Sequence, residues 1–231
     1  MKTIGLIGGM SWESSLEYYR IINETVKELL GGLHSAKSLM FSYDFEEIES
    51  LQHEGKWTEL SYSLTKIAKK LENAGAELIV ICTNTMHKVA DEMQKNLSIP
   101  IIHIADATAE KILEMKLLKI GLLGTKFTME ESFYKDRLNQ KYGLNVTIPD
   151  EKERQIIHDI IYNELVLGQI KENSRNIFID IIQNLIDSGV EGIILGCTEI
   201  PLLIKQDDVD LPLFDTATIH AKSAVKYALN L

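Results

Sequence analysis

The 231-residue chain has little of several features that would point to particular classes of protein. Its 24 basic residues are outnumbered by 34 acidic ones, and the net charge of −10 argues against a nucleic-acid partner, which needs a basic face. Aromatic residues, at 7%, leave no surface for stacking bases. No apolar run reaches the roughly 18 residues of a membrane span, and the N-terminus turns glycine-rich too early for a signal peptide. We therefore expect a cytoplasmic protein with neither nucleic-acid nor membrane partners.

Cysteine is almost absent, because only Cys82 and Cys197 are present. A reducing cytoplasm disfavours a disulfide between them, so each is either a small buried side chain or a reactive thiol. Thiolate chemistry at neutral pH needs the ordinary thiol pKa of about 8.5 to be lowered by backbone N–H groups or a helix N-terminus. After Cys197, Thr198 suits a helix cap and Pro201 a first helical turn, so such lowering is expected there.

Binding signatures for cofactors and metals are missing too. The segment GLIGGM lacks the glycine spacing of a dinucleotide-binding loop. Five histidines lack metal-ligand spacing, and the sixth, His87, is expected to pack beneath a polar turn. Asp106 and Asp215, on matching strand-to-loop stretches, are interpreted as helix caps. We expect no metal, nicotinamide or pyridoxal phosphate.

What the chain does contain is an alternation of short apolar strands and amphipathic helices. The strands are TIGLIG, SLMFSYD, ELIVIC and IPIIHI, and the intervening helices include SSLEYYRIINETVKELL and WTELSYSLTKIAKKLENAG. This order is typical of parallel sheets covered by helices. The sequence therefore predicts an α/β fold.

The order of elements then begins again in the second half of the chain. Residues 119–138 echo 3–20, residues 211–221 echo 99–109, and residues 187–199 match 73–85 without a gap. A period of about 114 residues is too long for a solenoid and indicates two α/β units, each with its own sheet. Ligands of open parallel sheets bind beyond the carboxyl ends of the strands, so two such ends are expected to face one cleft.

The ungapped match shows that the two cysteines are not equivalent. Cys82 aligns with Gly196, and Thr83 aligns with Cys197. Successive strand residues point to opposite faces, so a Cys197 aimed into the cleft implies that Thr83 also points there and Cys82 points away.

The segments GLIGGMSWES, CTNTMH, HIADAT, GCTEIP and PLFDTA together resemble the pyridoxal-phosphate-independent aspartate/glutamate racemase family. The resemblance covers essentially the whole chain and is strongest to the bacterial L-aspartate/glutamate-specific amino-acid racemase branch. It implies two pseudo-symmetric open parallel-sheet α/β domains with the active site in the cleft between them, for which we expect residues 1–98 plus 209–231 and residues 99–208. It also implies a homodimer, a small amino-acid substrate and no cofactor.

In that family two opposed thiols flank the substrate α-carbon, one removing the α-proton and the other returning a proton to the opposite face. Cys197 matches the second-half motif Gly-Cys-Thr, whereas Thr83 stands where the first-half motif has its cysteine. A hydroxyl is a far weaker acid than a thiol and is poorly suited to act as a free base. The resemblance thus implies an asymmetric enzyme, with Cys197 as the main acid/base facing the L substrate and Thr83 in the opposing slot.

The resemblance and the side-chain chemistry also nominate residues that bind the substrate. Met10 lies in the segment that resembles the family's substrate loop, where backbone N–H groups could hold a carboxylate. Gln52 stands where symmetric aspartate racemases have an arginine, and no lysine occurs near the family's lysine position before Lys171. Hydrogen-bond donors near the catalytic slots suit the α-carboxylate, and Glu199 suits the ammonium group. The full predicted set is Met10, Gln52, Thr83, Asn84, Thr85, Cys197, Thr198 and Glu199.

Two alternatives to racemisation stay open at this point. The decarboxylase and isomerase relatives of the same superfamily keep only the second-half thiol, which is also the situation here. A non-catalytic amino-acid-binding protein is the other alternative, favoured if Cys197 is unreactive.

Overall fold

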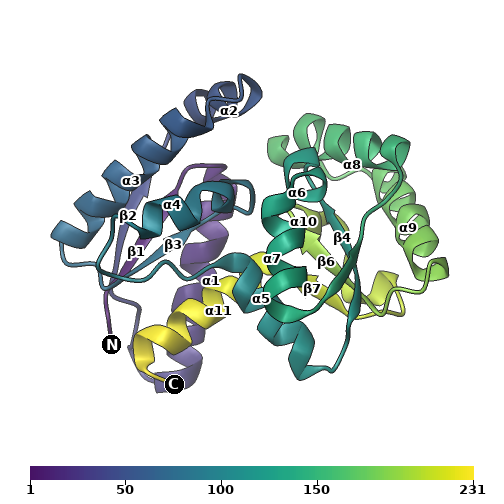
Figure 1. The fold of residues 1–231 in the computed structure, drawn as a ribbon. Coiled ribbons are helices and arrows are strands. Elements are labelled where there is room, and N and C mark those ends of the chain that lie inside the picture. Colours follow the sequence, from purple (N-terminus) through teal and green to yellow (C-terminus); the bar gives the residue numbers. More distant parts are fainter. The chain divides into compact units, whose positions relative to one another are not determined.

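The computed structural model describes residues 1–231, and the chain divides into two compact units. Unit 1 comprises residues 1–104 and 220–231, and unit 2 comprises residues 105–219. Each unit contains one parallel sheet accompanied by helices, as Figure 1 shows. The predicted α/β fold with a separate open parallel sheet in each half of the chain is confirmed.

The sheet of unit 1 has three strands in the order β2-β1-β3. These strands are β1 (Ile4–Gly8), β2 (Ser38–Ser42) and β3 (Leu78–Ile81). The helices of unit 1 are α1 (Trp12–Leu30), α2 (Phe45–His53), α3 (Trp57–Asn73), the 3-10 helix η1 (Thr85–Val89) and α4 (Ala90–Gln94). Two further helices run across the unit boundaries, namely α5 (Ile104–Glu114) and α11 (Thr216–Leu229).

The sheet of unit 2 has four strands in the order β5-β4-β6-β7. These strands are β4 (Lys119–Gly124), β5 (Asn145–Thr147), β6 (Gly192–Gly196) and β7 (Leu213–Asp215). Its helices are α6 (Lys126–Glu130), α7 (Ser132–Tyr142), α8 (Glu151–Asn163), η2 (Leu165–Leu167), α9 (Glu172–Asp187), α10 (Ile200–Leu203) and η3 (Gln206–Asp208). None of the helices in either unit combines the length and apolar character needed to cross a bilayer.

The two sheets repeat the same strand arrangement. In unit 1 the first strand lies between the second and third, as β4 lies between β5 and β6 in unit 2. Ile79 forms an isolated parallel bridge with Ile101, and its counterpart Ile193 pairs with Leu213 in β7. These pairs correspond under the repeat in the sequence, so that repeat reflects a shared topology.

A glutamate performs the same structural task at the start of each central strand pair. Oε2 of Glu77 accepts a hydrogen bond from the backbone N of Thr3, and Oε2 of Glu191 accepts one from the backbone N of Lys119, both at 2.8 Å. Backbone bonds from Leu118 and Lys119 hold the pKa of Glu191 below its ordinary value. These acids lie at the amino ends of the strands, away from the ends expected to bind a ligand.

Helix α3 covers one face of the unit 1 sheet. Its buried Leu60, Leu64 and Ile67 belong to the same apolar cluster as Ile79 and Ile81 of β3. The residues of β3 that alternate with these point to the opposite face and are buried as well, so both faces of the sheet are covered. Truncating one of these buried leucines to alanine is expected to destabilise the fold by about 2–5 kcal/mol.

The unit boundaries differ from the expected ones at two places. Residues 209–219 belong to unit 2, because β7 pairs with β6 and the chain returns to unit 1 only within α11. Residues 99–104 belong to unit 1 and form a single bridge where a strand was predicted. Pro100 has no N–H, and the N–H of Ile101 is bound by Oε1 of Gln94 at 2.7 Å, so this segment has few groups left for a strand ladder.

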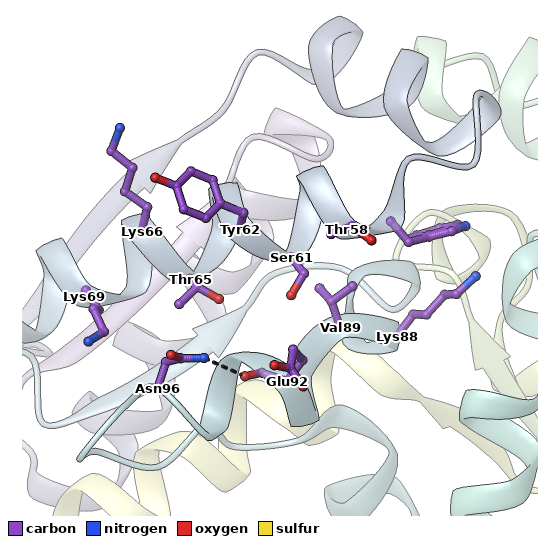
Figure 2. A pocket seen from close by; sticks show the side chains of 11 residues that line it. Thr58, Ser61, Tyr62, Thr65, Lys66, Lys69, Lys88, Val89, Glu92 and Asn96 are labelled. Atoms are coloured by element: carbon purple, nitrogen blue, oxygen red, sulfur yellow. Dashed lines mark hydrogen bonds between the residues drawn. The ribbon is translucent and has the colours of Figure 1, made fainter.

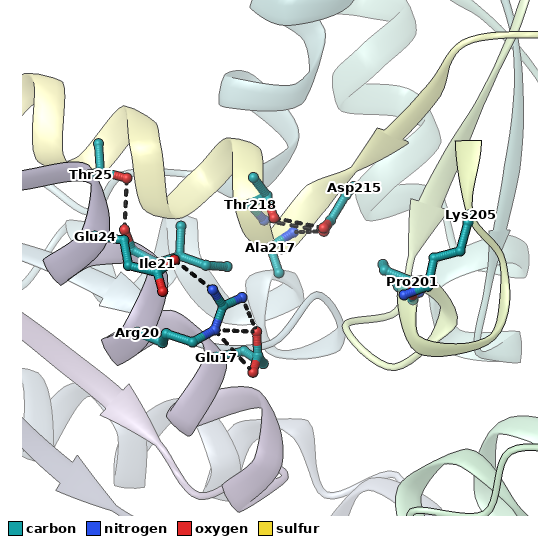
Figure 3. Close-up of polar contacts among 10 residues, drawn as sticks. All are labelled: Glu17, Arg20, Ile21, Glu24, Thr25, Pro201, Lys205, Asp215, Ala217 and Thr218. Atoms are coloured by element: carbon teal, nitrogen blue, oxygen red, sulfur yellow. Dashed lines mark hydrogen bonds and ion pairs between the residues drawn. The ribbon is translucent and has the colours of Figure 1, made fainter. Parts of the chain in front are cut away.

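The two aspartates interpreted as helix caps have different partners. Asp215 precedes α11, and its Oδ1 accepts hydrogen bonds from the backbone N atoms of Ala217 and Thr218 at 3.1 and 3.2 Å, as drawn in Figure 3. This confirms a capping role for Asp215. Asp106 forms ion pairs with Arg137 and Lys141 within unit 2, at 2.6 and 2.8 Å.

Candidate active site

Four predicted site residues of unit 1 lie at the carboxyl ends of β1 and β3. Met10 follows β1 in the loop that leads to α1, and its side chain is buried. Thr83 and Asn84 follow β3, and Thr85 is the first residue of η1. Asn84 and Thr85 are buried, whereas Thr83 is half-buried. Because β1 and β3 are neighbouring parallel strands, their carboxyl ends form one edge, where ligands of such sheets bind.

The loop that carries Met10 is pressed against the chain beyond β2. Gly9 has a φ of +84°, and a Cβ added there would lie 2.1 Å from the carbonyl oxygen of Tyr43, so only glycine fits. The N–H of Gly9 donates to Oγ of Ser15 at 2.7 Å. This N–H is therefore already used, although the sequence suggested that such groups could hold a substrate carboxylate.

Gln52 joins the same part of unit 1 from α2. Its side chain is only 4% exposed, and its Nε2 donates to Sδ of Met86 in η1 at 3.0 Å. Met86 and Met10 belong to one apolar cluster. The bond to Met86 uses one amide hydrogen of Gln52 and leaves the second hydrogen and the carbonyl oxygen for other partners.

The first cysteine is placed where no solvent reaches it. Cys82 is 0% exposed, and burial raises the pKa of its thiol far above the ordinary value. Its backbone is held from two sides, because its N–H donates to Ile7 O at 2.9 Å and its carbonyl accepts from Oγ of Ser14 at 2.6 Å. An inert, neutral thiol at this position agrees with the interpretation of Cys82 as a neighbour of the site.

In unit 2 the second cysteine meets a carboxylate. Cys197 directly follows β6, and its Sγ donates to Oε2 of Glu199 at 2.9 Å. The hydroxyl of Thr198 donates to the same oxygen at 2.7 Å. Cys197 and Glu199 are both buried, at 9% and 5% exposure. Three consecutive predicted residues thus form one hydrogen-bonded cluster within unit 2.

The electrostatics of Cys197 are the reverse of the expectation from the sequence. The pKa of its thiol is raised well above the ordinary value, first by burial and next by the negative charge of Glu199 and the hydrogen bond to it. Backbone N–H groups of Glu199 and Thr198 oppose this rise but do not outweigh it. The helix that follows, α10, has only four residues and contributes a weak dipole. The neutral thiol is therefore the stable form at rest.

Thr198 was predicted to cap the short helix α10, but it does not. The residue before α10 is Glu199, with no side-chain cap bond, and Thr198 donates to the Glu199 carboxylate instead. Pro201 does lie in the first turn of α10, as its sequence position indicated. A carboxylate one residue away competes for the threonine hydroxyl, because a hydrogen bond to an ionised acceptor is the stronger one.

A cavity of about 780 Å³ opens elsewhere in unit 1, between α3 and the segment of η1 and α4 (Figure 2). Lys66, Lys69 and Lys88 contribute to its lining, and the ammonium group of Lys88 lies 3.7 Å from the ring centroid of Trp57. None of the predicted site residues lines this cavity. It is therefore a separate surface hollow. No group of three His, Cys, Asp or Glu side chains is arranged to hold a metal ion.

Two polar residues that support the turn after β3 were not nominated as site residues. His87 was expected beneath the turn, and its Nδ1 bonds to the carbonyl oxygen of Thr83 at 2.8 Å. Ser14 of α1 binds the carbonyl of Cys82. The position of His87 four residues after Thr83 could have suggested such a bond, because residues at that spacing share one side of a helical turn. No local pattern indicates Ser14, which comes from a distant segment.

Comparison with known proteins places the chain in a family. A family model described as Asp/Glu/hydantoin racemase matches residues 7–224. The chain belongs to this family. The broad specificity amino-acid racemase RacX of Bacillus subtilis is 24% identical over 230 residues, which cover 96% of each chain.

Two solved structures are similar to this racemase-family chain over nearly its whole length. An Asp/Glu racemase candidate from Yersinia pestis is 53% identical, with a TM-score of 0.94, and the match covers 99% of this chain and 100% of the other. An aspartate racemase homologue from Pyrococcus horikoshii is 39% identical, with a TM-score of 0.87 and the same coverage. The family resemblance carried by the sequence motifs is thereby confirmed, and the chain has a racemase-like fold.

Proposed function

We propose that this member of the racemase family interconverts the L and D forms of an acidic amino acid, aspartate or glutamate, by removing and returning the α-proton without a cofactor. The observation that carries the proposal is the 2.9 Å hydrogen bond from Sγ of Cys197 to Oε2 of Glu199. It joins a thiol to a base at the carboxyl end of a parallel strand, where such sheets bind ligands. Membership of the family and the names of its relatives support the reaction class.

In the proposed mechanism the thiol and the carboxylate share one proton. Transfer of the Cys197 proton to Glu199 leaves a thiolate and a neutral carboxylic acid. The thiolate then takes the α-proton of the L substrate, and the C–H electron pair becomes the negative charge of a planar carbanion. In the opposite direction the neutral thiol of Cys197, which its raised pKa favours, returns a proton to the carbanion.

Thr83 is proposed to handle the proton on the opposite face. Its half-buried side chain follows β3 at the position that the sequence repeat matches to Cys197. Because a hydroxyl releases its own proton reluctantly, Thr83 acts as a relay, receiving a proton from water as it passes one to the carbanion. The hydroxide that the water leaves behind takes the proton held by Glu199, which restores the starting protonation state. Inversion is therefore expected to be slower than proton exchange on the Cys197 face.

Substrate binding is assigned to the predicted residues around the two catalytic positions. The second amide hydrogen of Gln52, which the bond to Met86 does not use, is proposed to bind the side-chain carboxylate of the substrate in place of an arginine. Because a neutral amide binds a carboxylate less strongly than a guanidinium group does, weak discrimination between acidic substrates is expected. Oε1 of Glu199, the oxygen that does not accept the hydrogen bond from the Cys197 thiol, is proposed to accept one from the ammonium group of the substrate. The proposed set is Met10, Gln52, Thr83, Asn84, Thr85, Cys197, Thr198 and Glu199.

Circular dichroism of the substrate provides the direct test of this function. L-aspartate, L-glutamate and several neutral L-amino acids are incubated separately with the purified protein, and the circular dichroism of the amino acid is followed. A signal that decays to zero for an acidic substrate supports racemisation. Retained optical activity with every amino acid, together with tight binding in calorimetry, would instead identify a binding protein.

A second candidate function is favoured by the single thiol at the catalytic positions. Because Cys82 is fully buried with a raised pKa, and Thr83 is a hydroxyl, a reaction that needs only one protonation suits the chain. Decarboxylation of an α-substituted malonate followed by proton addition from Cys197 is such a reaction. Release of carbon dioxide from phenylmalonate would favour this candidate, whereas racemisation of aspartate without that release would exclude it.

We further propose that the protein acts as a homodimer in the cytoplasm. The dimer is what the sequence resemblance implied, and the cytoplasm is the compartment in which free thiols stay reduced. Light scattering after size-exclusion chromatography measures the assembly, and a mass of one chain, 26.1 kDa, would contradict the dimer.

A further inference from the structure

Three successive backbone carbonyls of the turn after β3 are each bound by a donor within unit 1. The carbonyl of Cys82 accepts from Oγ of Ser14 at 2.6 Å. The carbonyl of Thr83 bonds to Nδ1 of His87 at 2.8 Å, and the carbonyl of Asn84 accepts from the backbone N of His87 at 3.0 Å. His87 thus holds two of the three. The turn that carries Thr83 is fixed through its backbone and leaves the threonine hydroxyl outside this set of bonds.

The chemistry of these bonds determines the tautomer of His87. A carbonyl oxygen can only accept, so the hydrogen of this bond resides on Nδ1 of the imidazole. Nδ1 is the ring nitrogen nearer the backbone, and it reaches back over the residues that precede His87. The bond consequently depends on a hydrogen carried by one particular ring atom, which is a specific requirement.

The ring of His87 is itself held by other buried rings. Its centroid lies 4.7 Å from that of His103 and 5.3 Å from that of His220, both in edge-to-face arrangements. His220 is fixed in turn, because its Nε2 bonds to the carbonyl of Ile102 at 2.6 Å and its Nδ1 lies 2.8 Å from the hydroxyl of Tyr18. Since Ile102 supplies only an acceptor, Nε2 of His220 carries the hydrogen and Tyr18 donates to Nδ1.

We propose that His87 is a positioning residue for the reaction, which fixes the backbone of Thr83 so that the hydroxyl meets the substrate face opposite Cys197. The inference rests on the proposed function and adds a residue to it. His87 is 2% exposed and acts through the Thr83 carbonyl, with no contact to substrate. A displacement of about 1 Å in a proton-handling group can slow a reaction by about 100-fold, so a buried bond to its backbone can control the rate.

The test compares two substitutions that differ in one donor. In His87→Asn the amide nitrogen stands as far along the side chain as Nδ1 does and can still donate to the Thr83 carbonyl. In His87→Leu the donor is lost while an apolar side chain fills the space. We expect His87→Leu to lower kcat for racemisation at least about tenfold with little change in KM, and His87→Asn to restore most of the rate.

Two further measurements separate positioning from general damage. Exchange of the α-proton on the Cys197 face should persist in His87→Leu, because that step does not need Thr83. Tyr18→Phe removes another buried hydrogen bond of the same cluster, to His220, and should lower the unfolding temperature while leaving racemisation nearly intact. Equal racemisation in the His87→Leu and His87→Asn variants, or equal loss in His87→Leu and Tyr18→Phe, would overturn the proposal.

A readout independent of activity protects the test against variants that fail to fold. Nitrogen-15 NMR of the wild-type imidazoles reports the tautomer of each histidine. The His87 signal is assigned as the one that is lost in His87→Asn. If that variant is unfolded, through-bond correlations provide the assignment. We expect the hydrogen of His87 on Nδ1, and a hydrogen on Nε2 alone would refute the bond and with it the proposal. Wild-type protein that racemises no amino acid, yet shows the expected tautomer, would count against the proposed function, and the role assigned to His87 would fall with it.

Discussion

Sγ of Cys197 donates a hydrogen bond to Oε2 of Glu199 over 2.9 Å, with both side chains buried beyond the carboxyl end of β6. This relationship has two effects with opposite consequences for catalysis. The carboxylate raises the pKa of the thiol, which makes Cys197 a weaker acid at rest. The same carboxylate is an acceptor placed to remove the thiol proton when a thiolate is required.

Glu199→Gln is the first test of this arrangement. The substitution removes the negative charge, so the pKa of the Cys197 thiol should fall relative to wild type while staying above the ordinary value because of burial. Thiolate absorbance near 240 nm during a pH titration measures this shift; burial raises the pKa of the second thiol, Cys82, in the same way in both proteins.

The same variant tests whether Glu199 takes part in the reaction. If Glu199 accepts the thiol proton, kcat for racemisation should drop by about 100-fold or more, the usual effect of losing a general base. Glu199→Asp, which keeps the charge on a shorter side chain, should retain part of the rate. A lower thiol pKa combined with unchanged kcat would show that Glu199 acts only on the resting thiol.

Thr83→Cys addresses the asymmetry between the two substrate faces. A thiol is more acidic than a hydroxyl by several pKa units, and each unit corresponds to about 1.4 kcal/mol between the protonation states. The variant should therefore raise turnover of the D substrate more than turnover of the L substrate. Initial rates with both enantiomers of aspartate and glutamate decide the question, since equilibrium fixes only the ratio of kcat/KM values. If kcat for the D substrate were unchanged in a folded variant, water or Cys82, and not Thr83, would handle the proton on the face opposite Cys197.

The buried His220 is expected to make unit 1 less stable as the pH falls. Burial, followed by the effect of neighbouring His87, lowers the pKa of His220 to about 3, whereas the unfolded chain has a histidine pKa of about 6.5. Below about pH 6.5 the unfolded state binds an extra proton, so the free energy of unfolding should fall by up to about 1.4 kcal/mol for each pH unit down to about pH 3.

Urea denaturation at a series of pH values measures this effect, with His220→Gln as the matched control. Glutamine can donate to the carbonyl of Ile102 and accept from Tyr18, the two bonds that His220 makes, but it does not titrate. The difference in free energy of unfolding between the two proteins should shrink or reverse as the pH falls. A difference that stays constant from pH 7 to pH 4 would mean that His220 titrates equally in the folded and unfolded states.

Sequence reasoning predicted the fold of each unit because the repeat preserves strand order and pairing. The match of Glu77 to Glu191 corresponds to equivalent bonds from Thr3 and Lys119 at the start of each central strand pair. The match of Thr83 to Cys197 is a local alignment that needs no side-chain detail. Such features follow from periodicity alone. The family assignment followed from motifs that run through both halves of the chain.

The features that were missed depend on side-chain direction or on distant segments. A thiol followed by a threonine and a proline suggested a lowered pKa. Burial of the Cys197 thiol, together with the Glu199 carboxylate turned onto it, raises that pKa instead. The support of the turn by Ser14 joins residues 68 positions apart, which no local pattern encodes. The weak pairing of residues 99–104 likewise depended on Gln94 binding the N–H of Ile101.

The most direct test of the central claim is proton NMR of L-aspartate and L-glutamate in heavy water with wild type, Cys197→Ala and Cys82→Ala. Because Cys197 is proposed as the residue that removes the α-proton, the α-proton signal should disappear with wild type and Cys82→Ala and persist with Cys197→Ala. Equal loss of exchange in both variants, or exchange that survives in Cys197→Ala, would contradict the assignment of the chemistry to Cys197.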